Sequence, residues 1–129
     1  MAEKSNLEAN KEAALDFLNL VIIGKIEEAY HNYINMGGMH HNVYFPAEFS
    51  ALKQGMLENH AQFPNKQFKV KHIIAEGNIV AVHSNIVLKP DEPGIAVVHL
   101  LRFEAGKIVE MWDIGEQIPA DSPNKAGAF

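Results

Sequence analysis

The sequence predicts an α+β domain in which three N-terminal helices pack on a curved, mainly antiparallel four-stranded sheet. In the first half of the chain, apolar residues recur at three- and four-residue spacing, which is the period of an amphipathic helix. After Pro64 the pattern changes to runs rich in β-branched residues, separated by short turn-forming segments. With 129 residues and no internal repeat or linker, we expect one domain that covers residues 1–129.

Glycines and a proline divide the helical half. Gly24 ends the first periodic segment, and Gly37 and Gly38 break the pattern of the second. Pro46 suits the first turn of a third helix. We expect a helix from Leu7 that stops at Gly24, a second from about Lys25 to Tyr33, and a third that begins after Pro46 and runs to Ala61. A loop before the third helix carries His40, His41 and Asn42.

Two antiparallel hairpins are predicted in the second half. Glu76-Gly77-Asn78 separates the strands of the first hairpin, and Glu104-Ala105-Gly106 separates those of the second. A polar, turn-rich segment at residues 89–94 connects the hairpins, and residues 119–129 have an irregular composition. The expected strands are residues 68–75, 79–88, 95–103 and 107–118.

Composition excludes several classes of function. A net charge of −5, with 11 scattered basic residues, argues against a partner made of nucleic acid. The apolar run from Leu18 to Ile23 contains Asn19 and follows an acidic segment, so we expect neither a signal peptide nor a membrane span. The absence of cysteine removes disulfides and thiolate chemistry and is consistent with a reducing compartment. We therefore expect a cytoplasmic protein.

The second hairpin brings a histidine and an aspartate onto one face. If Gly106 occupies the left-handed position of a bulged turn, Phe103 faces Lys107. Then His99 lies opposite Met111 and Val97 lies opposite Asp113, all on an apolar face. A two-residue turn would instead place His99 and Asp113 on opposite faces, so the inference depends on this bulge.

An imidazole beside a carboxylate in an apolar pocket can move protons near neutral pH. Desolvation raises the pKa of a carboxyl group, and a neighbouring imidazole tunes the position of the proton. Abstraction of a proton next to a carbonyl group is the reaction class that fits. The alternative, a structural hydrogen bond between a core histidine and a locally paired aspartate, is equally compatible with the pattern alone.

The chain resembles the SnoaL-like polyketide cyclases of the nuclear transport factor 2-like superfamily. The resemblance is carried by residues 102–113 (RFEAGKIVEMWD), residues 73–84 (IIAEGNIVAVHS), the Met39-His40-His41-Asn42 segment and the tail from Gln117. It implies a cone-shaped barrel with a deep central pocket, a homodimer formed through the sheet, and no cofactor.

Family cyclases catalyse an intramolecular aldol condensation with an aspartate as general acid/base and a histidine one strand earlier. The matching residues here are Asp113 and His99, whose separation of 14 positions is the family interval. Met111, where many relatives have histidine, and Val43, where proline is common, depart from the family pattern.

Further residues are candidates for binding a substrate. We expect His41 at the mouth of the pocket and His40 facing solvent, and we expect His83 either in the pocket or in the core. Trp112 falls on the face opposite Asp113, which favours a packing or dimer contact. The candidate substrate-binding residues are His41, His83, Tyr33, Tyr44, Val97 and Met111.

Three classes of function remain open. The first is a cofactor-independent lyase or isomerase that acts on a small hydrophobic or carbonyl-bearing molecule, with His41 or His83 steadying an oxyanion. The second is a ligand-binding or dimerisation module without turnover. The third is a metal site, which ranks last because no His-x-His or His-x-x-x-His spacing places two ligands together.

Overall fold

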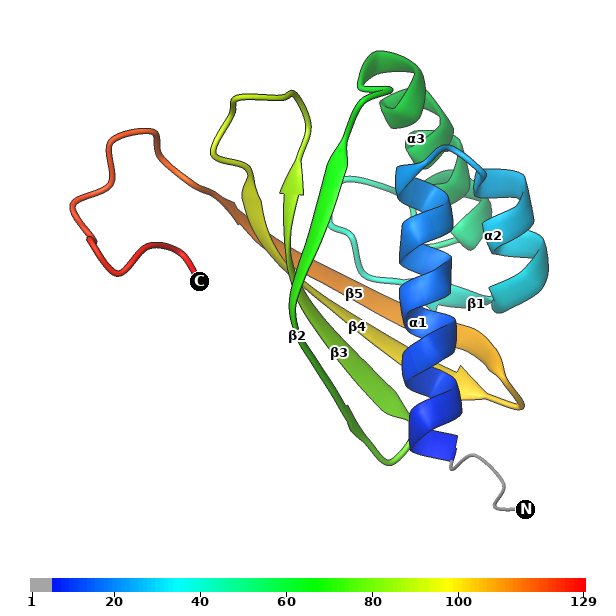
Figure 1. Ribbon diagram of the computed structural model, residues 1–129. Helices are drawn as coiled ribbons and strands as arrows, with labels where there is room; N and C mark the ends of the chain where they lie inside the picture. Colours follow the sequence, from blue (N-terminus) through cyan, green and yellow to red (C-terminus); the bar gives the residue numbers. More distant parts are fainter. Residues whose placement is uncertain (1–5) are drawn as a thin grey trace.

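The computed structural model describes residues 6–129, in which three helices lie on one side of a five-stranded sheet (Figure 1). The helices are α1 (Asn6–Ile22), α2 (Ile26–Tyr33) and α3 (Phe49–Gln62). Their bounds are close to those expected from the helical period, although α3 begins three residues later than Pro46. None of the described helices is both long and apolar enough to cross a membrane.

The sheet contains one strand more than the sequence predicted. Its strands are β1 (Ile34–His40), β2 (Gln67–Glu76), β3 (Ile79–Val87), β4 (Ile95–Glu104) and β5 (Lys107–Gln117), in the spatial order β1-β5-β4-β3-β2. The expected count of four was wrong because β1, placed in a loop by its glycines, pairs in parallel with β5. The other pairings are antiparallel, as expected.

A glycine allows β1 to approach β5. A Cβ atom at position 38 would lie 2.1 Å from the carbonyl oxygen of Val109, so only glycine fits there without a shift of the backbone. The sequence pattern indicated that Gly38 ends a helix. In the structure, Gly38 instead marks the close contact of two strands.

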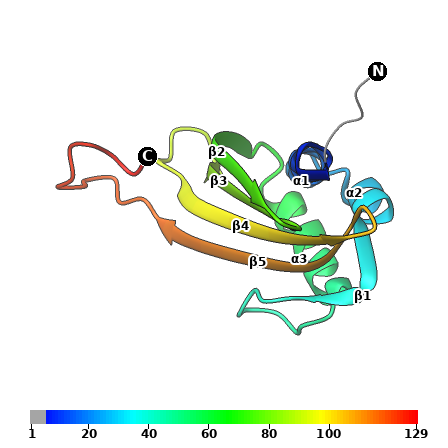
Figure 2. The same ribbon diagram turned by 90° about the horizontal axis from the view of Figure 1, so that it is seen from below.

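The sheet is strongly curved around the helices (Figure 2). The register shifts between Val70 and His72, where β2 has an extra residue, and between Arg102 and Phe103, where the partner strand β5 has one. Bulges of this kind bend a strand and increase its twist. The concave face holds the helices.

The core lies between α1, α2, α3 and the concave face. Phe17, Tyr30 and Phe49 form its aromatic centre, with ring centroids 5.7 Å apart for the first two and 6.4 Å apart for the last two. Val80, Val82 and Leu101 close it from the sheet, each fully buried. This packing fills one end of the cone and leaves the other end for a cavity.

The turn of the β4–β5 hairpin differs from the expected one. Glu104 pairs with Lys107, so the loop consists of Ala105 and Gly106, both with positive φ (50° and 78°). Two positive φ values are typical of a type I′ turn. The expected pairing of Phe103 with Lys107 was therefore wrong.

A bulge on β5 then restores the alternation that the two-residue turn had reversed. Phe103 pairs with Ile108 and Arg102 with Glu110, which leaves Val109 as the extra residue. Beyond the bulge, Leu101 pairs with Met111 and His99 pairs with Asp113.

Candidate functional site

A cavity of about 510 Å³ opens between α3, the loop after β1 and the concave face of β3, β4 and β5. Its wall is mainly apolar, and its volume is within the range of small-molecule sites. The polar side chains on the wall belong to Asn42, Tyr44, Asn59, Lys66, His99, Asp113 and Gln117.

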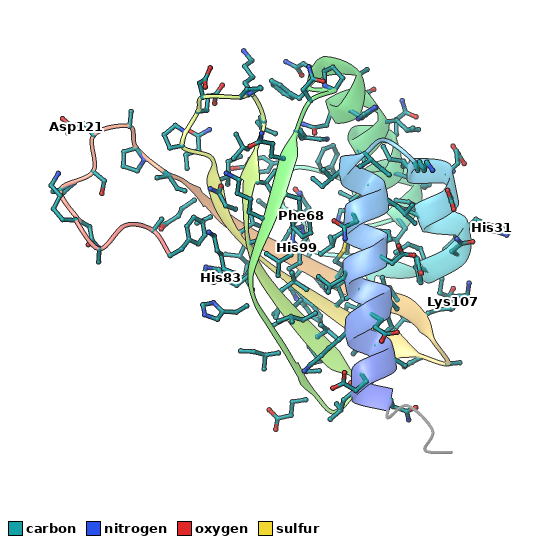
Figure 3. All side chains as sticks on the ribbon, viewed as in Figure 1. His31, Phe68, His83, His99, Lys107 and Asp121 are labelled. Atoms are coloured by element: carbon teal, nitrogen blue, oxygen red, sulfur yellow. The ribbon has the colours of Figure 1, made fainter. Side chains whose placement is uncertain are left out.

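His99 and Asp113 are directly paired across β4 and β5, and both line the cavity. Side chains at directly opposite positions share a face, with Cβ atoms about 4.5–5.5 Å apart. His99 is only 7% exposed, and Figure 3 shows it on the helix side of the sheet. The expected partners, Met111 for His99 and Val97 for Asp113, were wrong, yet the bulge brings the two polar residues closer than that register would.

The buried imidazole has an unused hydrogen-bonding atom. The Nδ1 atom of His99 has no hydrogen-bond partner among the described residues. Burial lowers the pKa of His99, and the charge of Asp113 opposes part of that shift. A neutral imidazole on the wall of an apolar cavity can donate one hydrogen bond and accept one through its two ring nitrogens.

Asn42 holds the carboxylate of Asp113 from the loop after β1. Its Nδ2 atom donates to Asp113 Oδ2 at 2.9 Å, while its Oδ1 atom accepts from the backbone N–H of Tyr44 at 3.0 Å. The second bond fixes which end of the amide faces the aspartate. The loop itself is attached to β5 through the His41 N–H, which donates to the carbonyl of Met111 at 2.9 Å.

Lys66 forms a second polar position on the wall. It lies between α3 and β2, half-buried, and its Nζ atom donates to Asn59 Oδ1 at 2.6 Å. Burial lowers the pKa of this lysine.

Two of the expected substrate-binding residues, Tyr44 and Val97, line the cavity. Met111 is instead 1% exposed within the hydrophobic core and is not part of the wall. Tyr33 lies outside the cavity and donates a hydrogen bond to Asp16, which raises the pKa of the Tyr33 hydroxyl to about 12.

His41 also lies outside the cavity, on the convex side of the sheet. Its ring stacks on Trp112 with centroids 5.0 Å apart, and its Nε2 atom lies 2.6 Å from Glu110 Oε2. The pKa of Glu110 is lowered by hydrogen bonds from His41 and Arg102. The expectation that His41 lies at the pocket mouth was therefore wrong, because the loop after β1 directs this side chain onto Trp112 of β5.

His83 is placed on the convex side as well. Its ring lies beside that of His72, with the two Nδ1 atoms 3.0 Å apart, and Figure 3 shows it pointing away from the helices. The two-residue turn between β2 and β3 sets this orientation, because Glu76 pairs with Ile79. His83 thus occupies neither the pocket nor the core, the two positions that the sequence left open.

The expectation that His40 faces solvent was wrong. His40 is 3% exposed at the end of β1, where its Nε2 atom lies 2.6 Å from the carbonyl oxygen of Pro46. Its Nδ1 atom accepts from the backbone N–H of Asn42 at 3.1 Å. This histidine shapes the loop that presents Asn42.

Sequence reasoning missed Asn42 and Lys66 as site residues. Asn42 was expected in the loop with His40 and His41 but not as a site residue, although an amide beside two histidines in a loop near the pocket mouth was a usable signal. Lys66 carries no signal of its own, because its position depends on the crossing from α3 to β2. Across residues 6–129, no three histidine, aspartate or glutamate side chains gather as a set that could hold a metal ion.

Solved structures of several proteins share this fold. AclR, a candidate hydroxylase from Streptomyces galilaeus, has a TM-score of 0.73 at 21% identity, over 85% of this chain and 90% of that one. A candidate SnoaL-like polyketide cyclase from Jannaschia sp. CCS1 has a TM-score of 0.68 at 16% identity, over 90% and 92%. An NTF-2 like protein of unknown function from Burkholderia xenovorans LB400 has a TM-score of 0.70 at 19% identity, over 91% and 89%.

At these identities the likeness establishes the fold alone. No curated protein is similar enough in sequence to match this chain. Residues 28–111, which extend from α2 into β5 and include His99, match the family model of the SnoaL-like domain. Because this match covers more than half of the sequence, the chain belongs to the SnoaL-like domain family.

Proposed function

We propose that this protein is a cofactor-independent lyase or isomerase, of the aldol-cyclase type, that acts on a small hydrophobic molecule with a carbonyl group. Asp113 serves as the general acid/base, and His99 holds or shares the proton. The observation that supports this proposal most directly is the pairing of His99 with Asp113 on the wall of an apolar cavity.

In the proposed reaction the Asp113 carboxylate accepts a proton from a carbon next to a carbonyl group. The resulting enolate carbon forms a bond to a second carbonyl carbon of the same molecule, and the new alkoxide takes the proton back from Asp113. All atoms of the substrate remain in the product. The hydrogen bond from Asn42 leaves one carboxylate oxygen, Oδ1, available for this transfer.

His99 contributes through its position and its neutral state. Its imidazole, on the cavity wall opposite Asp113, can bond to the substrate oxygen or share the proton with Asp113. Positioned acid/base groups of this kind typically accelerate proton transfer by about 10²- to 10⁴-fold. His41 and His83, which were candidates for steadying an oxyanion, have no part in the proposal because they lie on the convex side.

An exchange assay tests the proposal without knowledge of the natural substrate. The methyl protons of 2-acetylnaphthalene, a ketone of suitable size, are followed by NMR in D2O with and without the protein. We expect the wild type to accelerate their exchange for deuterium and Asp113→Asn to slow it at least about 100-fold. Glu116→Gln, a matched change at an exposed position of the same strand, should leave exchange unchanged.

Exchange in Asp113→Asn at the wild-type rate would refute the catalytic assignment. The alternative function, a non-catalytic ligand-binding or dimerisation module, predicts that both proteins bind the ketone equally and that neither accelerates exchange. The apolar wall of the cavity is the observation that favours this alternative.

Two further proposals concern the setting of the protein. The chain is expected to act as a homodimer and in the cytoplasm. Analytical ultracentrifugation tests the first expectation, since a sedimentation mass of a single chain would contradict it. Fractionation of the source cells tests the second.

A further inference from the structure

The cavity has a cationic end that the proposed reaction does not use. Lys66 lines the wall, and the only hydrogen bond from its ammonium group within residues 6–129 goes to the neutral side chain of Asn59. Lys53 and Arg102 have carboxylate partners, Glu27 for the first and Glu104 and Glu110 for the second. Lys107 bonds to backbone carbonyls at an exposed position, outside the cavity. Lys66 therefore differs from them, because it carries its charge into an apolar cavity without a counter-ion among the described residues.

Burial makes this arrangement costly in the empty protein. A charged group loses hydration when it is partly enclosed by apolar side chains, and the lowered pKa of Lys66 reflects this desolvation. An anion bound at the same place would restore the lost interaction, and charge-assisted hydrogen bonds to an anion are stronger than those to a neutral amide. The Nδ2 group of Asn59 could donate a second hydrogen bond there.

The two polar positions lie at different depths of the cavity. Lys66 directly precedes Gln67, which pairs with Val87 at the open end of the sheet. Ile86, the residue before Val87 on β3, pairs with Ile95 at the start of β4. His99 lies four residues after Ile95 on the same strand. At about 3.3 Å per residue, that stretch of β4 is about 13 Å long.

The wall between the two positions is mainly apolar, although Gln117, which pairs with Ile95, is polar. Ile86, Ile95 and Val97 line the cavity along this stretch. The shape and chemistry thus call for a molecule with an extended hydrophobic body and polar groups at both ends. An acid group would be directed away from the carboxylate of Asp113 by like-charge repulsion.

We infer that the cavity takes an elongated hydrophobic acid, whose anionic group binds Lys66 and Asn59 near the mouth while its carbonyl end reaches His99 and Asp113. The role given to the carbonyl end rests on the proposed function; the anion site does not. This inference names the substrate class and makes Lys66 a residue that determines specificity.

A matched pair of ligands tests the anion site by binding alone. The probe 6-acetyl-2-naphthoate carries a ketone and a carboxylate at opposite ends of a rigid apolar body, and 2-acetylnaphthalene lacks only the carboxylate. Fluorescence titration should show that the wild type binds the acid about tenfold more tightly or better than the neutral ketone. Lys66→Met should abolish that preference without changing the affinity for the neutral ketone, and Lys66→Arg should retain most of it.

Lys69→Met is the matched control, since Lys69 lies three residues away on β2, is exposed and does not line the cavity. If Lys66→Met keeps the preference for the acid, or if Lys69→Met loses it equally, the inference is wrong and Lys66 is a solvated lysine at the rim. A wild type that binds both probes equally would refute it as well.

The outcomes also separate this inference from the proposed function. A preference for the acid that depends on Lys66, without any exchange of the ketone protons, would leave the anion site intact and refute the catalytic role. Exchange that depends on Asp113, without a preference for the acid, would support the catalytic role and refute the anion site.

Discussion

Asn42 and Asp113 lie 71 positions apart in the chain and are joined by a hydrogen bond of 2.9 Å from Nδ2 to Oδ2. The bond links the loop after β1 to the middle of β5, at the wall of the cavity. It orients a carboxylate that is otherwise surrounded mainly by apolar side chains. Three consequences of the structure around this contact, and one of the adjoining hairpin, can be measured.

The variant Asn42→Asp should be less stable than the wild type by about 1–3 kcal/mol at pH 7. The new carboxylate keeps the acceptor for the Tyr44 N–H but replaces the donor to Asp113 with a second negative group. Urea unfolding measures the loss. Asn124→Asp, which adds the same charge in the C-terminal segment, should unfold at the wild-type midpoint; equal midpoints for all three proteins would show that the Asn42–Asp113 bond is not formed.

The stability of the protein should fall as the pH drops below the ordinary pKa of histidine, and His99 should account for part of the fall. Burial lowers the pKa of His99 in the folded state, so below about pH 6.5 the unfolded chain binds a proton that the folded chain does not. The contribution to the unfolding free energy is therefore lost from about pH 6.5 down to the folded pKa, by at most about 1.4 kcal/mol per pH unit.

Urea unfolding of the wild type and of His99→Gln between pH 8 and pH 5 isolates this effect. The other histidines are common to both proteins, so their contributions cancel in the difference. The unfolding free energy of the wild type minus that of His99→Gln should decrease as the pH is lowered. Parallel curves would mean that His99 titrates alike in the folded and unfolded states.

Much of the fold followed from the period of the sequence. The change of period after Pro64 predicted the helices and four strands, with ends close to those observed, because helix and strand periods of apolar residues differ clearly. The strand β1 was missed because the Gly37-Gly38 pair resembles a break, and its partner β5 lies about 70 residues later in the chain. A local pattern does not encode such a pairing.

The shared face of His99 and Asp113 was expected for a reason that proved incorrect. Gly106 was expected to form the bulge, whereas the bulge lies at Val109 and the turn has two residues. The position of a bulge depends on what packs against the strand, here β1 with Gly38 against the Val109 carbonyl. His41 and His83 were misplaced for the same type of reason, since loop direction decides the face of the first and strand register that of the second.

Gly38→Ala should destabilise the protein by about 1–3 kcal/mol, since the added methyl group would overlap the Val109 carbonyl and meet the ring of Phe49 at 3.0 Å. Gly37→Ala is the control, because a Cβ atom there meets only Asn35 Oδ1, at 3.3 Å. Thermal unfolding of both variants gives the comparison. If Gly38→Ala melts no lower than Gly37→Ala, β1 does not pair with β5 as closely as described.

Ala105→Asn should stabilise the protein, by about 0.5–1 kcal/mol. Ala105 adopts φ 50° at the first position of the two-residue turn, a conformation that is costly for most L-residues and more easily adopted by asparagine. The side chain is exposed, so no packing contact changes with the substitution. Ala105→Val, a β-branched residue that tolerates this conformation poorly, should destabilise the protein under the same conditions.

The bulged turn expected from the sequence places only Gly106 in the left-handed region, and in that turn asparagine at position 105 would bring no gain. The sign of the change in unfolding free energy for Ala105→Asn therefore distinguishes the two turns, and with them the bulge at Val109 that sets His99 beside Asp113.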